Sequence, residues 1–250
     1  MNFCVCIKQV PDVTAPIQVS GGQLVMDAGR VVLNAYDASA VEAALVLTEA
    51  HGGEVDVVLV GPERASEAIR KALAMGATRG THLVVPEGAE LDSAAVSQIL
   101  AAHLAGHAYD AILAGKQAQD SDAGLAGGML AERLGLPVAT NAVGLAQEGG
   151  TLVVTRQGDA GQEILALPTP CVVTCSNDMN DPRIPNLKGI MAAKKKTIDA
   201  QPVADVPAPL VRTRAYETVP ARAPGRRLDG DAAEVAAEAV RLLADEARAI

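Results

Sequence analysis

The segment LAGKQAQDSDAGLA, residues 113–126, contains the residues whose types and spacing best suit ligand chemistry. It follows a run expected to form a strand and opens a run expected to form a helix, where an α/β sheet presents backbone N–H groups to a phosphate. Small side chains let a ligand approach, and Gly124, Gly127 and Gly128 each weaken a helix, which favours a packing or ligand reason for them. The segment therefore predicts nucleotide binding of a general kind.

Several specific ligand motifs are excluded. Gln117 stands where a Walker loop requires Ser or Thr after Gly-Lys, and no G-x-G-x-x-G follows the first expected strand. The stretch from Asp120 to Gly124 has the first acidic positions of an EF-hand loop, but Ala131 occupies the position of the bidentate Glu. Asp120 and Asp122 have an alternative role as caps of the following helix.

The other reactive residue types do not form a catalytic set. The sequence has no serine nucleophile elbow, no convincing Cys/His pair and no carboxylate pair placed for acid–base chemistry. His103 and His107 are four residues apart, but no third metal ligand is apparent, so exposed histidines and no metal are expected. The cysteines lack C-x-x-C spacing and are expected to be buried structural thiols: Cys4, Cys6, Cys171 and Cys175. An enzyme acting alone is not indicated.

A second unusual segment is LKGIMAAKKK, residues 187–196, which follows the stretch NDPRIP. Pro182 and Pro185 restrict the backbone there, so Leu187 is expected to be an exposed and preordered side chain. The three lysines suit contact with an acidic surface, and their alternative reading is a solvated strand end.

Composition limits the class of protein. The chain has 250 residues, 49% of them hydrophobic, and a net charge of -9, which predicts a folded globule and argues against a nucleic-acid partner. No apolar run approaches the roughly 18 residues of a membrane span, and the first residues do not read as a secretory signal. We therefore expect a cytoplasmic protein without membrane insertion.

Alternating strand and helix patterns occupy the first two-thirds of the chain. They predict a doubly wound, mostly parallel, Rossmann-like α/β sheet, whose ligands lie at the carboxyl ends of the strands. The expected strands are 3–10, 55–60, 82–85, 110–113 and 171–175, and the expected helices are 38–49, 64–75, 93–105 and 125–134. Residues 145–167 read as antiparallel hairpins at one edge of the sheet.

The last fifth of the chain changes character. Residues 197–230 are rich in Pro, Ala and Arg without periodicity, which predicts an extended arm. Asp231 is placed to cap a terminal helix with an apolar stripe of Val235, Ala239, Leu242 and Leu243. The stripe can cover a partner or fold back on its own domain. We therefore divide the chain into a nucleotide-binding domain, 1–197, and an arm with a helix, 198–250.

Together, five motifs resemble the β subunit of electron transfer flavoprotein. They are VCIKQVPD, the loop NAYD before AVEAAL, AIRKALAMGATRGTHL, AGKQAQDSDAG and NDPRIPNLKGIMAAKKK, and the resemblance runs in order from residue 2 to about 199. It implies a non-enzymatic electron carrier that pairs with an α subunit. That pair shares one FAD, held mainly by α, while the β subunit carries a structural AMP.

The resemblance also implies site residues. Tyr36 and Val13 would lie near the flavin, although Val13 replaces an aromatic residue. Gly124 and Val60 also depart from the family pattern, replacing an asparagine and a cysteine. The AMP positions are Cys6, Asn34, Ala35, Tyr36, Asp37, Val60, Gly115, Lys116, Gln117, Ala118, Gln119, Asp120, Ser121, Asp122, Ala123, Gly124, Leu125 and Ala126.

Residues from about 175 to 197 resemble the recognition loop of the family. That loop docks acyl-CoA and related dehydrogenases, whose electrons pass through FAD to a quinone-linked oxidoreductase. The implied recognition residues are Leu187, Ile190, Met191, Lys194, Lys195 and Lys196. Two alternatives remain open: a bifurcating flavoprotein with a second FAD in place of AMP, and a stand-alone adenine-nucleotide sensor of the universal-stress type.

Overall fold

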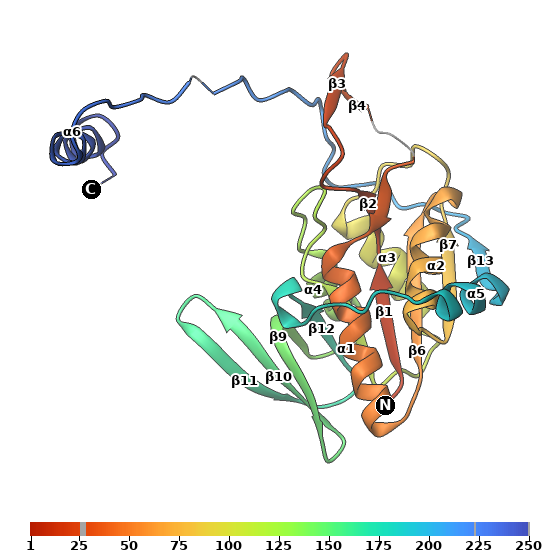
Figure 1. Ribbon diagram of the computed structural model, residues 1–250. Coiled ribbons are helices and arrows are strands. Elements are labelled where there is room, and N and C mark those ends of the chain that lie inside the picture. The colour runs from red at the N-terminus through yellow and green to blue at the C-terminus, as the bar shows by residue number, and fades with distance from the viewer. Residues whose placement is uncertain (26–28, 223, 250) are drawn as a thin grey trace. The chain divides into compact units, whose positions relative to one another are not determined.

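The computed structural model describes residues 1–25, 29–222 and 224–249 in two units, Met1–Tyr216 and Glu217–Ile250 (Figure 1). We expected the nucleotide-binding domain to end at residue 197, whereas the first unit continues to Tyr216.

A nine-stranded sheet forms the centre of the first unit, in the order β11-β10-β9-β12-β8-β1-β6-β7-β13. Neighbouring strands from β9 to β13 in this order are parallel, while β10 runs antiparallel to β9 and β11. The strands are β1 (Phe3–Ile7), β6 (Val55–Gly61), β7 (Arg79–Val84), β8 (Ala111–Gly115), β9 (Val138–Glu148), β10 (Thr151–Gly158), β11 (Gly161–Leu167), β12 (Cys171–Cys175) and β13 (Ile198–Pro202). The predicted parallel sheet and its antiparallel edge are confirmed.

Helices cover both faces of the sheet. On β1, Phe3, Val5 and Ile7 point into the core shared with α1 (Ala35–His51) and α2 (Ser66–Met75). Cys4 and Cys6 point to the other face, into the core shared with α3 (Ser93–Leu104) and α4 (Ala126–Leu134). This alternation is the period of two that a strand imposes, and it confirms the doubly wound α/β fold.

The strand predicted over residues 3–10 is interrupted at Lys8. Lys8 N–H donates to the Asp37 carboxylate at 2.7 Å, so the chain leaves the sheet after Ile7. It continues as β2 (Gln9–Pro11), which pairs with β5 (Val31–Leu33). A hairpin of β3 (Gln18–Ser20) and β4 (Gln23–Val25) lies between them, and both Gly21 and Gly22 have the positive φ that its tight turn needs.

The segment predicted as a recognition loop contains a helix, α5 (Leu187–Lys195). The side chain of Asn186 caps it by accepting from Gly189 N–H at 2.9 Å, which is why the helix starts at Leu187. The prediction of an arm without secondary structure from residue 197 is wrong at its start, because β13 pairs with β7. In β13 only Ile198 packs against the core, so the segment lacks the periodicity that reveals a strand.

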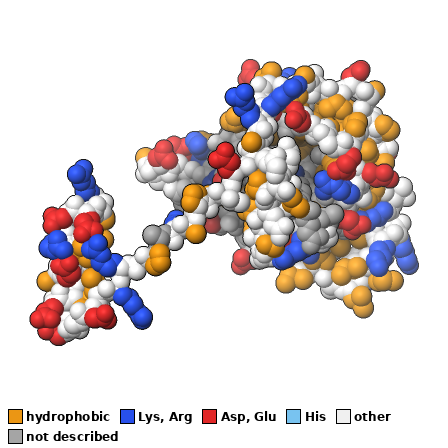
Figure 2. Space-filling view, turned by 90° about the horizontal axis from the view of Figure 1, so that it is seen from above, with side chains coloured by type: hydrophobic (Ala, Val, Ile, Leu, Met, Phe, Trp, Pro, Cys, Tyr) orange, Lys and Arg blue, Asp and Glu red, His pale blue; other side chains and the backbone are white. Residues whose placement is uncertain are grey.

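The second unit contains α6 (Ala232–Asp245), the predicted terminal helix. Asp231 caps it by accepting from Ala233 and Glu234 N–H at 2.9 and 3.1 Å, as expected. None of its described side chains is fully buried, and Figure 2 shows acidic and basic side chains mixed on its surface.

Gly80 in β7 gives a test of this packing. A Cβ at this position would overlap Cγ2 of Ile69, which is fully buried on α2 and has no room to move. We expect Gly80→Ala to lower the free energy of unfolding by about 1–3 kcal/mol in urea denaturation. The exposed Gly106, whose added Cβ would meet nothing within 4 Å, is the control, and Gly106→Ala should stay within about 0.5 kcal/mol. Equal effects of the two substitutions would contradict the packing.

Candidate functional site

A cavity of about 550 Å³ lies at the carboxyl ends of β1, β6 and β8, beside the starts of α3 and α4. This is the edge of a parallel sheet at which ligands are expected. Most of the residues that the resemblance assigned to AMP line it: Cys6, Asn34, Asp37, Val60, Gly115, Lys116, Gln117, Ala118, Ser121, Ala123, Gly124, Leu125 and Ala126. The predicted loop and the cavity therefore coincide.

The other assigned residues lie outside the cavity lining and support the loop instead. Ala35 N–H donates to the side chain of Gln119 at 3.1 Å, and Asp122 accepts from the side chain of Gln117 at 2.8 Å. Tyr36 lies below Lys116, whose Nζ is 6.0 Å from the ring centroid. Asp120 forms an ion pair with Lys8 at 2.8 Å.

Asn34, almost fully buried at the start of α1, fastens the loop of residues 115–126. Its side-chain amide donates to Gln117 O at 2.9 Å and accepts from Gln119 N–H at 3.1 Å. The amide thus pairs with the loop backbone as a neighbouring strand would. Asn34 holds the shape of the loop rather than offering these two groups to a ligand.

The first turn of α4 opens into the cavity. Its N-cap is Leu125, which has no side-chain acceptor, so the interpretation of Asp120 and Asp122 as caps is wrong. Both carboxylates are instead engaged with Lys8 and Gln117. The first N–H groups of a helix have no partner within the helix, and Ala126 and Gly127 line the cavity. These groups are therefore available to an anion, which the helix dipole also favours.

Gly127 is required by packing. A Cβ there would overlap Cγ2 of Thr174 on β12, so α4 lies too close to the sheet for any larger residue. A Cβ at Gly124 would meet Lys116 O at 3.1 Å, where the loop closes on itself. The two glycines therefore have packing reasons in this structure.

The lining combines apolar and cationic groups. Val60, Leu100 and Leu130 contribute apolar surface, whereas Lys8 and Lys116 contribute amines and Ser121 a hydroxyl. An apolar wall beside cations and free N–H groups fits a ligand with a flat ring system and a phosphate. The residues present therefore fit a nucleotide.

Asp37 is the buried acid of the site. Its carboxylate accepts N–H groups from Lys8 at 2.7 Å and from Gly115 at 3.0 Å, which joins the ends of β1 and β8. Burial raises its pKa to about 7, opposed by hydrogen bonds from Asn34, Lys8 and Gly115. The hydrogen bonds from Asn34 and from the two backbone N–H groups thus favour the charged form of Asp37, and burial disfavours it more strongly.

Part of the lining was not anticipated. The loop before α3 contributes Leu91 and Asp92, and the first turn of α3 contributes Ser93 and Ala94. These residues could have been found because they follow β7 at the same edge of the sheet. Val96, Leu100, Met129 and Leu130 come from the helices behind it. Leu210, Val211 and Thr213 come from the expected arm, where no sequence pattern indicates a contact.

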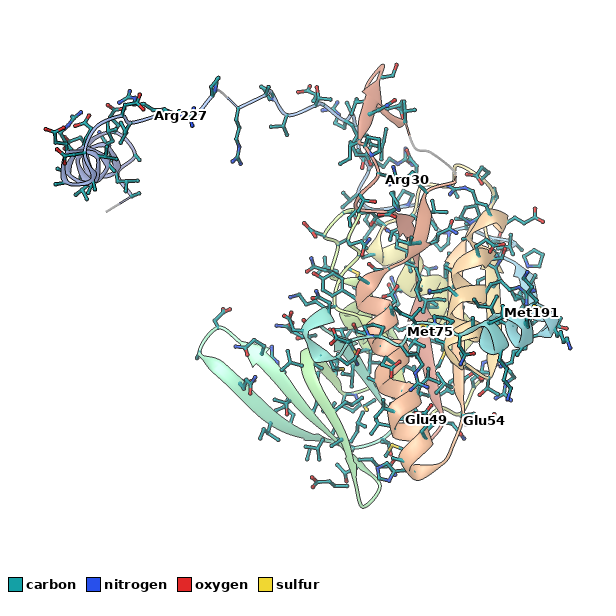
Figure 3. All side chains as sticks on the ribbon, in the orientation of Figure 1. Arg30, Glu49, Glu54, Met75, Met191 and Arg227 are labelled. Carbon is teal, nitrogen blue, oxygen red and sulfur yellow. The ribbon has the colours of Figure 1, made fainter. Side chains whose placement is uncertain are left out.

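Exposed apolar side chains lie on α5 and on the segment just before it. Helix α5 is on the side of the sheet that carries α2 (Figure 3, where Met75 and Met191 mark the two helices). Leu187 is 76% exposed, as predicted, and Ile190 and Met191 are also exposed. Ile184, 89% exposed, adds an apolar group that was not predicted. We call Ile184, Leu187, Ile190 and Met191 the α5 surface.

The α5 surface is held firmly from below. Arg70 on α2 donates to Ala193 O and Lys196 O, and Lys196 Nζ donates to Ala77 O. Gly189 allows the close approach, because a Cβ there would come within 2.6 Å of Ala74 O. Lys196 is therefore bound within its own unit, while Lys194 and Lys195 are exposed.

Arg183 fixes the segment that leads into α5. Its guanidinium donates to Glu42 and Glu49 of α1 at 2.5–3.0 Å, and its N–H donates to Glu42 at 3.1 Å. Asn180 adds a bond from its side chain to Ser39 O at 3.0 Å. The prolines expected to order this stretch are thus assisted by an ion-pair cluster on α1.

The expectation of buried structural thiols is confirmed. All four cysteines are buried free thiols, and no described group of His, Cys, Asp and Glu is arranged to hold a metal. The rings of His103 and His107 lie 4.6 Å apart. Val13 is 75% exposed. No helix in the described part of the chain is long and apolar enough to cross a membrane.

Comparison with known proteins relates the chain to one family. The family model for the electron transfer flavoprotein domain matches residues 23–206. An electron transfer flavoprotein subunit beta from Bacillus subtilis (strain 168) is 33% identical over 257 residues, covering 100% of both chains. One from Mycobacterium leprae (strain TN) is 37% identical, over 82% of this chain and 80% of its own. The caffeyl-CoA reductase-Etf complex subunit CarD of Acetobacterium woodii is 38% identical, over 79% of this chain and 77% of its own.

Asp37 predicts a pH dependence of stability. Because its pKa is raised from 3.8 to about 7 in the fold, the folded state binds more protons than the unfolded state between these values. Asp37 therefore lowers stability as pH rises through this window, by an amount on the order of a few kcal/mol. Asp37→Asn removes this titration. From pH 4 to 7 the free energy of unfolding of the variant should therefore rise relative to that of the unmodified chain.

The control is Asp12→Asn. Hydrogen bonds from Thr14 lower the pKa of the partly exposed Asp12, so its contribution to stability has the opposite pH dependence and is lost as pH falls. Urea denaturation at four pH values between 4 and 8.5 measures both variants. Parallel curves for Asp37→Asn and the unmodified chain would show that Asp37 does not titrate in this range.

Proposed function

The chain belongs to the electron transfer flavoprotein family as a β subunit, and we propose that its cavity binds AMP. Proteins of this family are heterodimeric electron carriers associated with flavin and nucleotide. The observation that carries the proposal is the uncapped start of α4, which opens into the cavity beside Lys8 and Lys116.

The roles of the lining residues follow from their chemistry. The free N–H groups of α4 and the amine of Lys116 would hold the phosphate, and Lys8, which pairs with Asp120, would add positive charge nearby. Val60, Leu100 and Leu130 would pack against the base. Gly124 and Val60 stand where the family pattern has an asparagine and a cysteine. At these two positions the nucleotide would therefore be recognised by backbone groups and apolar packing.

In this proposal FAD is shared with an α subunit, which holds most of it. The flavin, when bound, supplies reversible uptake and release of electrons. Tyr36 and Val13 of this chain would lie against it. Val13 is 75% exposed and Tyr36 is partly exposed, so both are accessible to a partner. The second unit, Glu217–Ile250, would contact the same partner, and the absence of a fully buried residue among the described part of α6 supports this role.

The α5 surface would dock acyl-CoA and related dehydrogenases, whose electrons pass through FAD to a quinone-linked oxidoreductase. Exposed apolar side chains on a rigid support lose little entropy on binding and can fill a pocket of a partner. Lys194 and Lys195 remain exposed for contact with an acidic surface, whereas Lys196 is bound to Ala77 O.

A second candidate is a bifurcating flavoprotein subunit, in which a second FAD occupies the cavity in place of AMP. The observation in its favour is the 38% identity to a protein named as a subunit of a caffeyl-CoA reductase-Etf complex. Family membership leaves no support for the stand-alone sensor.

The nucleotide content of the protein separates the two candidates. We expect the chain expressed alone to be colourless, because the cavity beside α4 is assigned to AMP, and the heterodimer with its α subunit to be yellow. Denaturing the heterodimer and separating the released nucleotides should yield one FAD and one AMP. Two FAD would establish the second candidate, and stoichiometric FAD on the chain alone would overturn the assignment of the cavity.

Leu187→Ala tests the docking role. An exposed anchor contributes on the order of 1–3 kcal/mol to binding, so flavin reduction by an acyl-CoA dehydrogenase should fall about tenfold to hundredfold at subsaturating concentration. The melting temperature and nucleotide content should not change, because Leu187 is 76% exposed.

The matched control is Ile164→Ala, since Ile164 is 74% exposed on β11, away from α5. This variant should keep the full rate of flavin reduction. An unchanged rate in Leu187→Ala, or an equal loss in both variants, would remove the docking role from the α5 surface.

A further inference from the structure

Asp92 connects two segments that are far apart in the sequence. Its Oδ1 accepts from Ala95 N–H at 2.8 Å and caps α3. Its Oδ2 accepts from Leu210 N–H at 2.7 Å and Val211 N–H at 3.0 Å. These hydrogen bonds lower the pKa of Asp92, with the bond from Ala95 contributing most, so the group is a carboxylate at neutral pH.

The segment that Asp92 holds forms one wall of the cavity. Leu210, Val211 and Thr213 line it together with Ala126 and Gly127 of α4. We call residues 210–216 the strap. Its far end is fixed where Tyr216 N–H donates to Gly22 O at 2.9 Å.

Apolar burial does not hold the strap in place. Leu210 is 81% exposed and Val211 is 75% exposed, so neither side chain is anchored in the core. Arg212 and Glu90 form an ion pair at 3.4 Å, but both side chains are more than half exposed, and such a pair contributes little. The two bonds to Asp92 are charge-assisted and are therefore the main attachment of this end of the strap.

We propose that Asp92 is a positioning residue of the nucleotide site, which holds the strap as a wall of the cavity and thereby strengthens binding of the nucleotide. The inference rests on the proposed function, because it assumes that the cavity binds AMP. Asp92 acts through the strap, since its own oxygens are engaged by backbone N–H groups.

The substitution Asp92→Asn separates the cap of α3 from the attachment of the strap. Asn caps helices about as well as Asp, so Asp92→Asn can keep the bond to Ala95 N–H. The substitution replaces the second oxygen by an NH₂ group, which cannot accept from Leu210 and Val211 N–H. The cap of α3 is thus retained while the strap is released. Asp92→Ala removes both roles.

The experiment uses the full-length chain freed of nucleotide. AMP is titrated by calorimetry, and hydrogen exchange is followed at residues 208–216. We expect faster exchange in the strap and a Kd for AMP raised at least about tenfold in Asp92→Asn, with a melting temperature near that of the unmodified chain. Asp92→Ala should show the same loss of affinity together with a lower melting temperature.

Glu90→Gln is the matched control. It removes the same charge from the same loop and breaks the ion pair with Arg212, but leaves Asp92 unchanged. Its affinity for AMP should stay within about twofold of the unmodified chain. A loss equal to that of Asp92→Asn would assign the effect to charge rather than to the strap.

The outcomes distinguish the inference from the proposed function. Faster exchange in the strap with unchanged AMP affinity, or no change in exchange, overturns the inference while AMP binding stands. If the unmodified chain binds FAD instead of AMP, the same variants are titrated with FAD. A Kd for FAD raised at least about tenfold in Asp92→Asn would then support the role of Asp92, and an unchanged Kd would overturn it. If neither nucleotide binds, both the proposed function and the inference are wrong.

Discussion

The carboxylate of Asp37 occupies the point where the two central strands stop pairing. Strands β1 and β8 are hydrogen-bonded neighbours up to Cys6 and Ala114. Just beyond, Lys8 and Gly115 donate their N–H groups to the two oxygens of Asp37, in the first turn of α1. A buried N–H must find an acceptor, and here a side chain replaces the neighbouring strand. The two chains can therefore diverge, one toward β2 and the other into the loop of residues 115–126, and the cavity opens between them.

Close packing around this point sets the residue types of the loop. A Cβ on Gly115 would overlap Oδ1 of Asp37, and one on Gly127 would overlap Thr174. Asn34 then fastens the loop backbone through Gln117 and Gln119. The loop is consequently built before any ligand arrives, and the free N–H groups of α4 are presented by a rigid frame, which reduces the entropy lost on binding.

The sequence predicted the elements that have a periodic apolar pattern and the segments that have a distinctive local composition. Alternating apolar runs indicated the parallel sheet, and a glycine-rich segment between strand and helix indicated the loop that lines the cavity. The exposure of Leu187 followed from an apolar residue between prolines and lysines. The roles of Asp37, Asn34 and Asp92 could not be read in this way, because each depends on partners more than 25 residues away that only the folded chain brings close. Helix α5 was missed because Pro182 and Pro185 suggested a loop, whereas the cap at Asn186 starts a helix directly after them.

Helix α1 relates the cavity to the α5 surface. Its first turn carries Asp37 at the cavity, and its later turns carry Glu42 and Glu49, which hold Arg183 on the way to α5 (Figure 3 labels Glu49). Between these ends Ala40, Val41 and Ala44 are fully buried against the sheet, so the helix has no space to shift. Coupling between distant sites requires an element with two arrangements, and a close-packed helix offers only one. The two sites are therefore fixed in one frame, and changes at the cavity and at the α5 surface should act additively on stability.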